Sequence, residues 1–452
     1  MHPFWWAAWL APSPLIIATL SAPVSHRRWL TLLGGAMGGV SSFSYHLTVG
    51  GWFVALLTIV LVALAWSSAI RLAVVFAERR QFALALLSVP VMWAAVDTLL
   101  IHLSPHGSAG SIAYSQMNAL PVIQVASIGG LPAITFVVML GGGLFGLLLG
   151  RRIETDWRGK LTASSVALLA IGAALAFGLS RLHGADQAPG PNVALIATDG
   201  VDGRQSSWTG FWQVYGDWIE RSATRGSIVV LPEAVLDLPD TRAEAAARRL
   251  ADMASQTGST IVVGISVEGA HGITGRALVA QSNGTYRWYR KQHLIPGIEA
   301  ELTPGSEPLV LPFGETAIGI AICKDMHFPT LGREYAERGS ALMLVPANDF
   351  EVDDWLTARM TILRGVESGF SIARSARGGG MSFVSDRYGR VIAERRSDTA
   401  MGALKAQTSL NFDGSTIYSS AGDLFGWMCV LAWGTLIALR FGLIRPVSRR
   451  VE

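Results

Sequence analysis

Cys323 is the residue of this 452-residue chain whose surroundings most favour chemistry. It ends the apolar run 316–323, TAIGIAIC, and is followed at once by Lys324 and Asp325. The other cysteine of the sequence, Cys429, lies in a hydrophobic stretch near the C-terminus, so Cys323 has no disulfide partner in its own region. A thiol at the tip of a strand, beside a cation, is a candidate nucleophile. A buried structural cysteine is the alternative interpretation.

Two charged residues elsewhere in the sequence could activate such a thiol. Glu233 follows Pro232, and Lys291 stands in the stretch 289–294, YRKQHL. A thiol with a pKa of ~8.5 is only slightly ionised at neutral pH, so it needs a base, and a tetrahedral adduct needs positive charge at its oxygen. Glu233 could supply the base and Lys291 the charge. Taken singly, each fits a surface position better than a catalytic one, and only their conjunction with Cys323 favours catalysis.

Short β-rich runs alternate with helical stretches between residues 192 and 415, and this alternation predicts an α/β layered fold. The expected strands are 192–197, 227–231, 260–266, 277–281, 316–322, 341–346, 370–374 and 381–384. The expected helices are 208–224, 241–256, 330–338 and 354–368.

Polar residues follow three of these expected strands. Glu233 comes after the strand at 227–231, Cys323 closes the strand at 316–322, and Asn348 and Asp349 follow the strand at 341–346. Functional residues of layered α/β folds gather where strands end, so these side chains are expected to share one pocket. An alternative role for Asn348 and Asp349 is to cap the helix that follows.

The ordered set of motifs resembles the carbon–nitrogen hydrolase (nitrilase) superfamily. The matching stretches are 232–233 (PE), 291–294 (KQHL), 323–325 (CKD), 348–349 (ND) and 364–367 (RGVE). This resemblance implies an αββα sandwich and a Glu–Lys–Cys triad, here Glu233, Lys291 and Cys323. Each motif alone is weak, whereas their order and spacing together are specific.

The remainder of the chain has the composition of a membrane protein. Half of all residues are hydrophobic and only 15% are charged, and the mean hydropathy is +0.39. Seven segments approach the ~20 apolar residues that cross a bilayer. They are 4–20, 29–45, 52–76, 82–103, 134–149, 161–179 and 424–441. We expect Pro12 and Pro14 to kink the first, and the apolar stretch 119–132 to be a re-entrant piece or an extension of the fifth.

The predicted organisation has three parts. A multispan α-helical membrane domain of about six helices occupies residues 1–185, the α/β domain occupies 190–415, and a C-terminal transmembrane helix occupies 423–443. Clusters of Lys and Arg at 26–28, 78–80, 151–160 and 445–450 all fall on one side of this arrangement, whereas the loops 48–51 and 104–116 carry none. Basic loops stay in the cytoplasm. We therefore expect a bacterial inner membrane protein with a periplasmic α/β domain and a cytoplasmic C-terminus.

With its membrane segments included, the whole chain resembles the apolipoprotein N-acyltransferase branch of the superfamily, notably over 104–149 and 358–360. That resemblance implies a general base at Glu233, an oxyanion-stabilising Lys291 and an acyl thioester on Cys323. It also implies supporting roles for Glu299 and Trp208. The implied partners are a phospholipid acyl donor, the N-terminal amine of a diacylglyceryl lipoprotein and the lipid bilayer. No metal and no organic cofactor is implied.

The sequence departs from that branch around the nucleophile. Lys324 and Asp325 replace the usual Tyr-Glu, the stretch 299–323 is short, an additional first span of the family is missing, and 198–200 replaces a Gln-x-Asn motif. Two alternatives therefore stay open: a periplasmic amidase-like hydrolase with another substrate, and a divergent, non-catalytic membrane protein of a conjugal-transfer system. The net charge of +3 without a basic stripe argues against nucleic acid as a partner. The sequence leaves the oligomeric state open.

Overall fold

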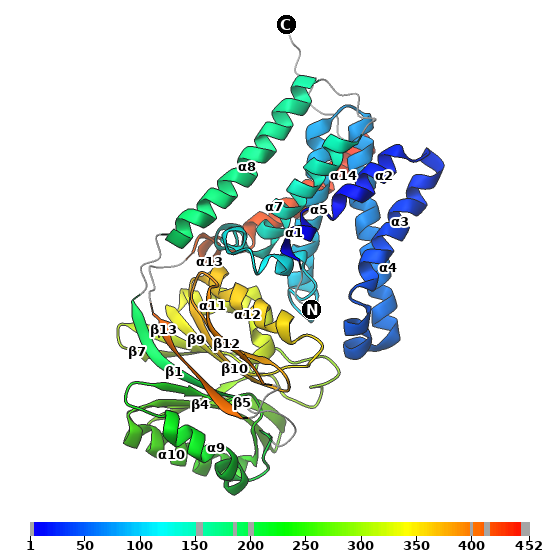
Figure 1. The fold of residues 1–452 in the computed structure, drawn as a ribbon. Coiled ribbons are helices and arrows are strands. Elements are labelled where there is room, and N and C mark those ends of the chain that lie inside the picture. Colours follow the sequence, from blue (N-terminus) through cyan, green and yellow to red (C-terminus); the bar gives the residue numbers. More distant parts are fainter. Residues whose placement is uncertain are drawn as a thin grey trace. The chain divides into compact units, whose positions relative to one another are not determined.

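A computed structural model describes residues 4–150, 157–183, 188–197, 203–397, 401–410 and 416–443. The chain divides into two compact units (Figure 1). The helical unit comprises His2–Leu103, Gly110–His183 and Asp423–Glu452. The α/β unit comprises Gly184–Gly422 together with the short segment Ser104–Ala109. This confirms the predicted fold class, in which an α-helical region built from apolar helices accompanies an α/β domain.

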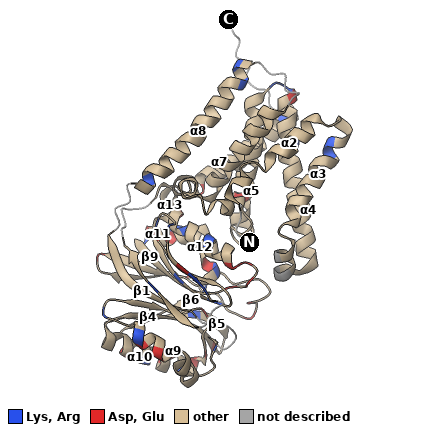
Figure 2. Ribbon diagram, in the orientation of Figure 1, with Lys and Arg blue, Asp and Glu red and all other residues tan. Residues whose placement is uncertain are grey.

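The helical unit is built mainly from long apolar helices. Its elements are α1 (Trp5–Ala8), α2 (Pro12–Ser21), α3 (Val24–Val40), α4 (Phe43–Glu78), α5 (Phe82–Leu103), the 3-10 helix η1 (Ile112–Gln116), α6 (Leu120–Ile123), α7 (Ala126–Leu149), α8 (Trp157–His183) and α14 (Leu424–Arg440). Among the described residues, four helices are long and apolar enough to cross a membrane: Gly50–Glu78, Phe82–Leu103, Ala126–Leu149 and Trp157–His183. In α8 the Lys and Arg residues lie near the two ends (Figure 2), so the middle of the helix carries none.

The other three expected spans differ from the prediction in detail. The segment 4–20 is two helices, because Pro12 begins α2 at the first helical position, where the missing N–H of proline costs no hydrogen bond. The second expected span corresponds to α3, which has only 17 residues, and α14 is equally short. The stretch 119–132 forms α6 and the beginning of α7, with non-helical backbone at Gly129 and Gly130, so it extends the fifth span.

Helix α5 is the buried centre of the helical unit and packs against α4, α7 and α14. Its one carboxylate, Asp97, accepts a hydrogen bond from the Ser111 hydroxyl at 2.8 Å and another from the Thr135 hydroxyl. A polar group within an apolar bundle must be satisfied by neighbouring side chains. These contacts tie α5 to α7 and to the start of η1.

The α/β unit contains two sheets whose strands come from distant parts of the sequence. Its strands are β1 (Pro189–Ala197), β2 (Ile228–Val230), β3 (Leu236–Pro239), β4 (Thr260–Gly269), β5 (Gly272–Ala280), β6 (Tyr286–Arg290), β7 (Leu309–Phe313), β8 (Thr316–Ile320), β9 (Ser340–Asn348), β10 (Ser371–Arg377), β11 (Met381–Ser385), β12 (Val391–Arg396) and β13 (Gly402–Ser409). The first sheet has the order β13-β1-β2-β4-β5-β6, with β3 paired to β4, and the second has the order β12-β11-β10-β9-β8-β7. In the middle of each sheet, β1-β2-β4 and β8-β9-β10 run parallel.

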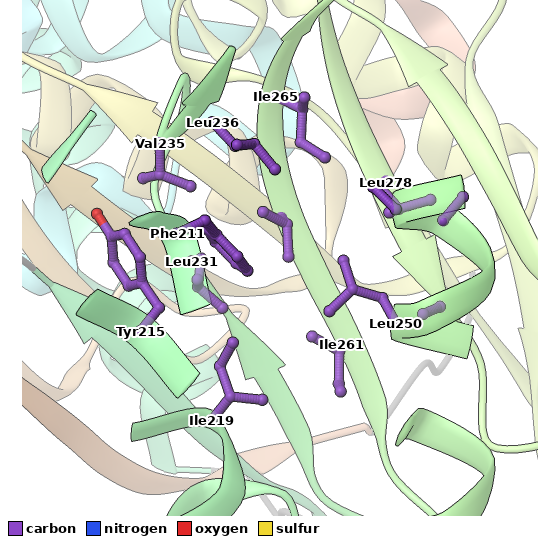
Figure 3. Close-up of a cluster of buried hydrophobic side chains, with 14 of the residues drawn as sticks. Phe211, Tyr215, Ile219, Leu231, Val235, Leu236, Leu250, Ile261, Ile265 and Leu278 are labelled. Atoms are coloured by element: carbon purple, nitrogen blue, oxygen red, sulfur yellow. The ribbon is translucent and has the colours of Figure 1, made fainter. Parts of the chain in front are cut away.

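The two sheets face one another across a continuous apolar core. Buried side chains from β1, β2 and β4 meet those from β8, β9 and β10 there, and Cys323 lies at the edge of this cluster of residues. Helices α9 (Trp208–Ser222) and α10 (Asp240–Thr257) cover the outer face of the first sheet, with Phe211, Tyr215, Ile219 and Leu250 packed onto its strands (Figure 3). Helices α11 (Pro329–Glu337) and α12 (Asp354–Ser368) lie on the second sheet (Figure 1). The result is the expected αββα sandwich.

Candidate active site

Glu233 lies just beyond the carboxyl end of β2, where the first sheet meets the second. Its backbone N–H donates to the carbonyl of Ala347 on β9 at 3.2 Å. A Cβ atom on Gly264 of β4 would lie only 2.4 Å from the Cα of Glu233, so glycine is required at this close approach. The next residue, Ala234, has a φ of 52°. The backbone of neighbouring strands therefore fixes the position of this carboxylate.

Lys291 follows β6 and has a side chain that is only 1% exposed. Its ammonium donates to Oε1 of Glu233 at 2.8 Å and to Oε1 of Glu299 at 2.7 Å. The second carboxylate oxygen of Glu299 accepts the N–H of Ile295 at 2.7 Å, which holds the loop after Lys291 in place. The structure thus brings together three residues that the sequence singled out: Glu233, Lys291 and Glu299.

Cys323 begins the 3-10 helix η3 (Cys323–His327) directly after β8. Its φ of 44° lies in the left-handed region that non-glycine residues rarely adopt. Such strained backbone clusters at functional sites, and here it occurs at Cys323 and again beside Glu233, at Ala234. The thiol is 5% exposed and contacts the backbone carbonyl of Asn348 at 3.5 Å.

The electrostatics of the triad favour a neutral thiol next to a charged ammonium. Burial, and then the negative charge of Glu233, raise the pKa of Cys323 well above its ordinary value. Burial also opposes the charge of Lys291, but the neighbouring acidic groups, chiefly Glu233, prevail and raise its pKa. Burial raises the pKa of Glu233, Lys291 offsets part of that rise, and Glu299 adds to it. A carboxylate with a raised pKa is a better acceptor for the thiol proton.

Asp325 links the nucleophile turn to the lysine loop. Its Oδ1 accepts the backbone N–H groups of Gln292 at 3.1 Å and His293 at 2.8 Å. Its Oδ2 accepts the Tyr289 hydroxyl at 2.7 Å and the N–H of Ile322 at 3.0 Å. The carboxylate is fully buried, so these charge-assisted hydrogen bonds are strong. We expect Asp325 to position Cys323 relative to Lys291 without touching substrate.

Asp325→Asn should lower the turnover number while leaving the fold intact. An asparagine amide carries N–H donors where two backbone N–H groups must be accepted, so the turn should shift, and a displacement of about 1 Å can cost on the order of 10²-fold in rate. The measurement is the rate at which Cys323 reacts with an activated ester, followed alongside thermal unfolding. Tyr289→Phe removes a single hydrogen bond to Asp325 and should retain most of the rate. An unchanged rate in Asp325→Asn would show that this carboxylate does not position the thiol.

Asn348 and Asp349 have roles that differ from helix capping. Helix α12 begins at Asp354, with Asp353 before it, so neither residue caps that helix. Asp349 instead forms a buried bidentate ion pair with Arg374 of β10, at 2.8 and 2.5 Å. Asn348 contributes its backbone carbonyl to the thiol contact. Sequence reasoning missed Arg374, because an arginine within a strand gives no local sign of its partner.

Trp208 lies at the first residue of α9, on the outer face of the first sheet. Its ring stacks on Trp212 and packs near Phe211, with the Arg249 guanidinium above it. These contacts place it in the layer of α9 and α10, in a different cluster from Cys323. Its described environment is that of a packing residue. The 198–200 stretch that departs from the family motif lies outside the described residues.

The segment Ser104–Ala109 also contacts the nucleophile turn, a contact that no local sequence pattern predicts. Both the N–H and the hydroxyl of Ser108 donate to the carbonyl of His327, at 3.2 and 2.8 Å. Gly107 has a φ of 60°, and a Cβ atom there would lie 2.7 Å from the same carbonyl oxygen. This segment, contiguous in sequence with α5, therefore closes over the end of the turn that begins at Cys323.

Comparisons with known proteins agree with this architecture. Residues 201–418 match the carbon-nitrogen hydrolase family model, and residues 2–144 match the model of the apolipoprotein N-acyltransferase N-terminal domain. The chain is 25% identical over 402 residues to an apolipoprotein N-acyltransferase of Geobacter metallireducens, covering 80% of this chain and 75% of that protein. It is 28% identical over 157 residues to a hydrolase of Mycobacterium tuberculosis, covering 30% of this chain and 55% of that protein.

Among solved structures, an amidase from Nesterenkonia sp. is similar to the chain, with a TM-score of 0.44 and 23% identity over 50% of this chain and 93% of that one. The two family models account for the two units in turn, and the relative from Geobacter spans both. The chain is therefore an enzyme with a carbon–nitrogen hydrolase domain, and it is apolipoprotein N-acyltransferase-like across both units.

Proposed function

We propose that this protein is a membrane N-acyltransferase that moves an acyl group from a phospholipid, through a thioester on Cys323, to the N-terminal amine of a diacylglyceryl lipoprotein. The observation that carries the proposal is the buried cluster in which Lys291 bridges Glu233 and Glu299, next to the strained backbone of Cys323. A small-molecule amidase would have no evident need for four long apolar helices. Their presence favours a substrate that resides in the bilayer.

The proposed reaction has two half-reactions that use the same residues. Glu233 accepts the Cys323 proton as the sulfur attacks an ester carbonyl of the phospholipid, and the Lys291 ammonium stabilises the oxyanion that forms. Collapse of the adduct breaks the ester C–O bond, Glu233 returns the proton to the departing lysophospholipid oxygen, and the acyl group remains on sulfur. The acceptor amine then attacks the thioester and loses a proton to Glu233. Expulsion of the sulfur, which regains that proton, leaves an amide and the free thiol.

The proposed location is the bacterial inner membrane, with the α/β domain in the periplasm and the C-terminus in the cytoplasm. The support is the distribution of basic residues described above, in which Arg27, Arg28, Arg79 and Arg80 follow α2 and α4. The basic residues at 151–156 and 445–450 lie outside the described residues.

One observation favours a second candidate, an amidase-like hydrolase with another substrate. The chain between Glu299 and Cys323 is short and contains only β7 and β8 among its regular elements. Within this described segment there is accordingly no long arm that a lipid chain could follow. The two candidates differ in the group that attacks the thioester: an amine in the first and water in the second.

The acceptor experiment separates these two candidates. Purified protein in detergent would be given a phospholipid with a labelled acyl chain and a peptide that begins with diacylglyceryl-cysteine. We expect labelled amide on the peptide and none on the same peptide with its amine acetylated, because the acetylated nitrogen is not nucleophilic. Release of labelled fatty acid with no labelled amide on either peptide would instead support the hydrolase.

A further inference from the structure

Lys324 is a buried lysine whose ammonium is held by a backbone carbonyl. The residue is 3% exposed, and its ammonium donates to the backbone carbonyl of Leu294 at 2.7 Å. A lysine ammonium carries three donors, and within the described part of the chain no carboxylate forms an ion pair with this one. Burial of a charge is costly unless an ion of opposite sign accompanies it.

The acidic groups nearest to Lys324 along the chain and around the site are already engaged. Asp325 accepts two backbone N–H groups on one oxygen, and a hydroxyl and a third N–H on the other. Glu299 binds the Lys291 ammonium with one oxygen and the N–H of Ile295 with the other. Lys291 moreover adds a second positive charge to the same site. Burial and then the charge of Lys291 lower the pKa of Lys324 to about 8, and the opposing effects of Glu299, Cys323 and Asp325 are too weak to offset them.

The position of Lys324 limits which molecule could place a negatively charged group beside its ammonium. The residue follows Cys323 directly in the sequence, so an anion bound at its ammonium would belong to the molecule whose carbonyl meets the sulfur. In a phospholipid, the phosphodiester is separated from the ester carbonyls by only the glycerol backbone. The acceptor brings an amine to this place, and an amine carries no negative charge.

We propose that Lys324 binds the phosphodiester of the acyl donor and so selects phosphate-bearing lipids over neutral acyl esters. This inference rests on the proposed function and adds a specificity-determining residue to it. Lysine suits the task because its ammonium is a compact point charge that binds phosphate without a fixed fork geometry. The bond to Leu294 holds the ammonium in place and leaves two donors for the ligand.

The test compares two donors that have the same acyl chains, phosphatidylglycerol and diacylglycerol, presented in the same detergent micelles. The readout is kcat/KM for acylation of Cys323. Wild-type protein should prefer phosphatidylglycerol by about 10- to 100-fold, the worth of one hydrogen bond to a charged group. Lys324→Gln keeps an N–H donor for Leu294 but loses the charge, and its preference should fall towards unity. Lys324→Arg keeps the charge and should retain most of the preference.

Two results would overturn the proposed role of Lys324, and a third would also overturn the proposed acyltransferase function. An unchanged preference of Lys324→Gln for phosphatidylglycerol over diacylglycerol would show that the charge of Lys324 does not bind the phosphate. Equal losses for both donors in that variant would show that Lys324 only holds the Leu294 carbonyl. If neither donor acylates Cys323 in the wild-type protein, the proposed acyltransferase function fails and this inference fails with it.

Discussion

Alanine in place of Cys323 is expected to abolish acyl transfer, with a fall in kcat of at least about 10⁴-fold, because nucleophile and base act as one unit. The residue is the candidate nucleophile, and no hydroxyl or second thiol of the described chain contacts it. Burial and the charge of Glu233 raise the pKa of this thiol, so it is neutral at rest. The sulfur therefore reacts only when Glu233 removes its proton. The measurement is transfer of labelled acyl groups to the diacylglyceryl-cysteine peptide.

Cys429 provides the matched control for this variant. It is the second cysteine of the sequence and lies in α14 of the helical unit, outside the candidate site. Cys429→Ala should transfer acyl groups at close to the wild-type rate. Substantial transfer by Cys323→Ala, with a normal thermal unfolding profile, would show that another residue is the nucleophile or that no covalent intermediate forms.

Glutamine in place of Glu233 should lower kcat by about 10²- to 10⁴-fold, the usual worth of a general base. The amide oxygen of glutamine can still accept the Lys291 hydrogen bond, so the fold and KM should change little. In the wild-type protein, activity should fall as the pH drops through the pKa of Glu233, since the protonated carboxyl cannot accept the thiol proton. Burial raises this pKa, so the acid limb of the profile should lie above the range of an ordinary glutamate. The measurement is the pH dependence of kcat/KM.

An exposed glutamate nearby gives the control for this second prediction. Glu301 lies two residues after Glu299 and is exposed to solvent, so Glu301→Gln should leave both the rate and the acid limb unchanged. A Glu233→Gln variant that keeps the wild-type rate, or that keeps the acid limb at the same pH, would remove Glu233 from the role of base.

The fold was predictable from sequence where strands are buried on both faces. All eight expected strands correspond to observed ones, because continuous apolar runs such as 316–322 are typical of strands in a sandwich core. The strands missed are the short β3 and the edge strands β6, β7, β12 and β13. Edge strands are partly exposed, and some carry charges, as in the sequence YRWYR of β6, so their hydrophobic pattern is weak.

The candidate site was predictable to the extent that its residues follow strands. Glu233 and Cys323 do so, and topology alone brings the ends of β2 and β8 towards one another. The supporting residues depend on contacts between distant segments that no local pattern encodes, such as Arg374 with Asp349. The supporting role that the resemblance implies for Trp208 stays a prediction, and the structure places this residue beside Arg249 of α10 in the outer layer.

Intact-protein mass spectrometry after incubation of the detergent-purified protein with bacterial phospholipid tests the central claim most directly. We predict a mass increase of one acyl group that hydroxylamine removes, present in the wild-type protein and absent from Cys323→Ala. No adduct on a wild-type protein whose Cys323 is still alkylated by iodoacetamide would contradict the thioester mechanism.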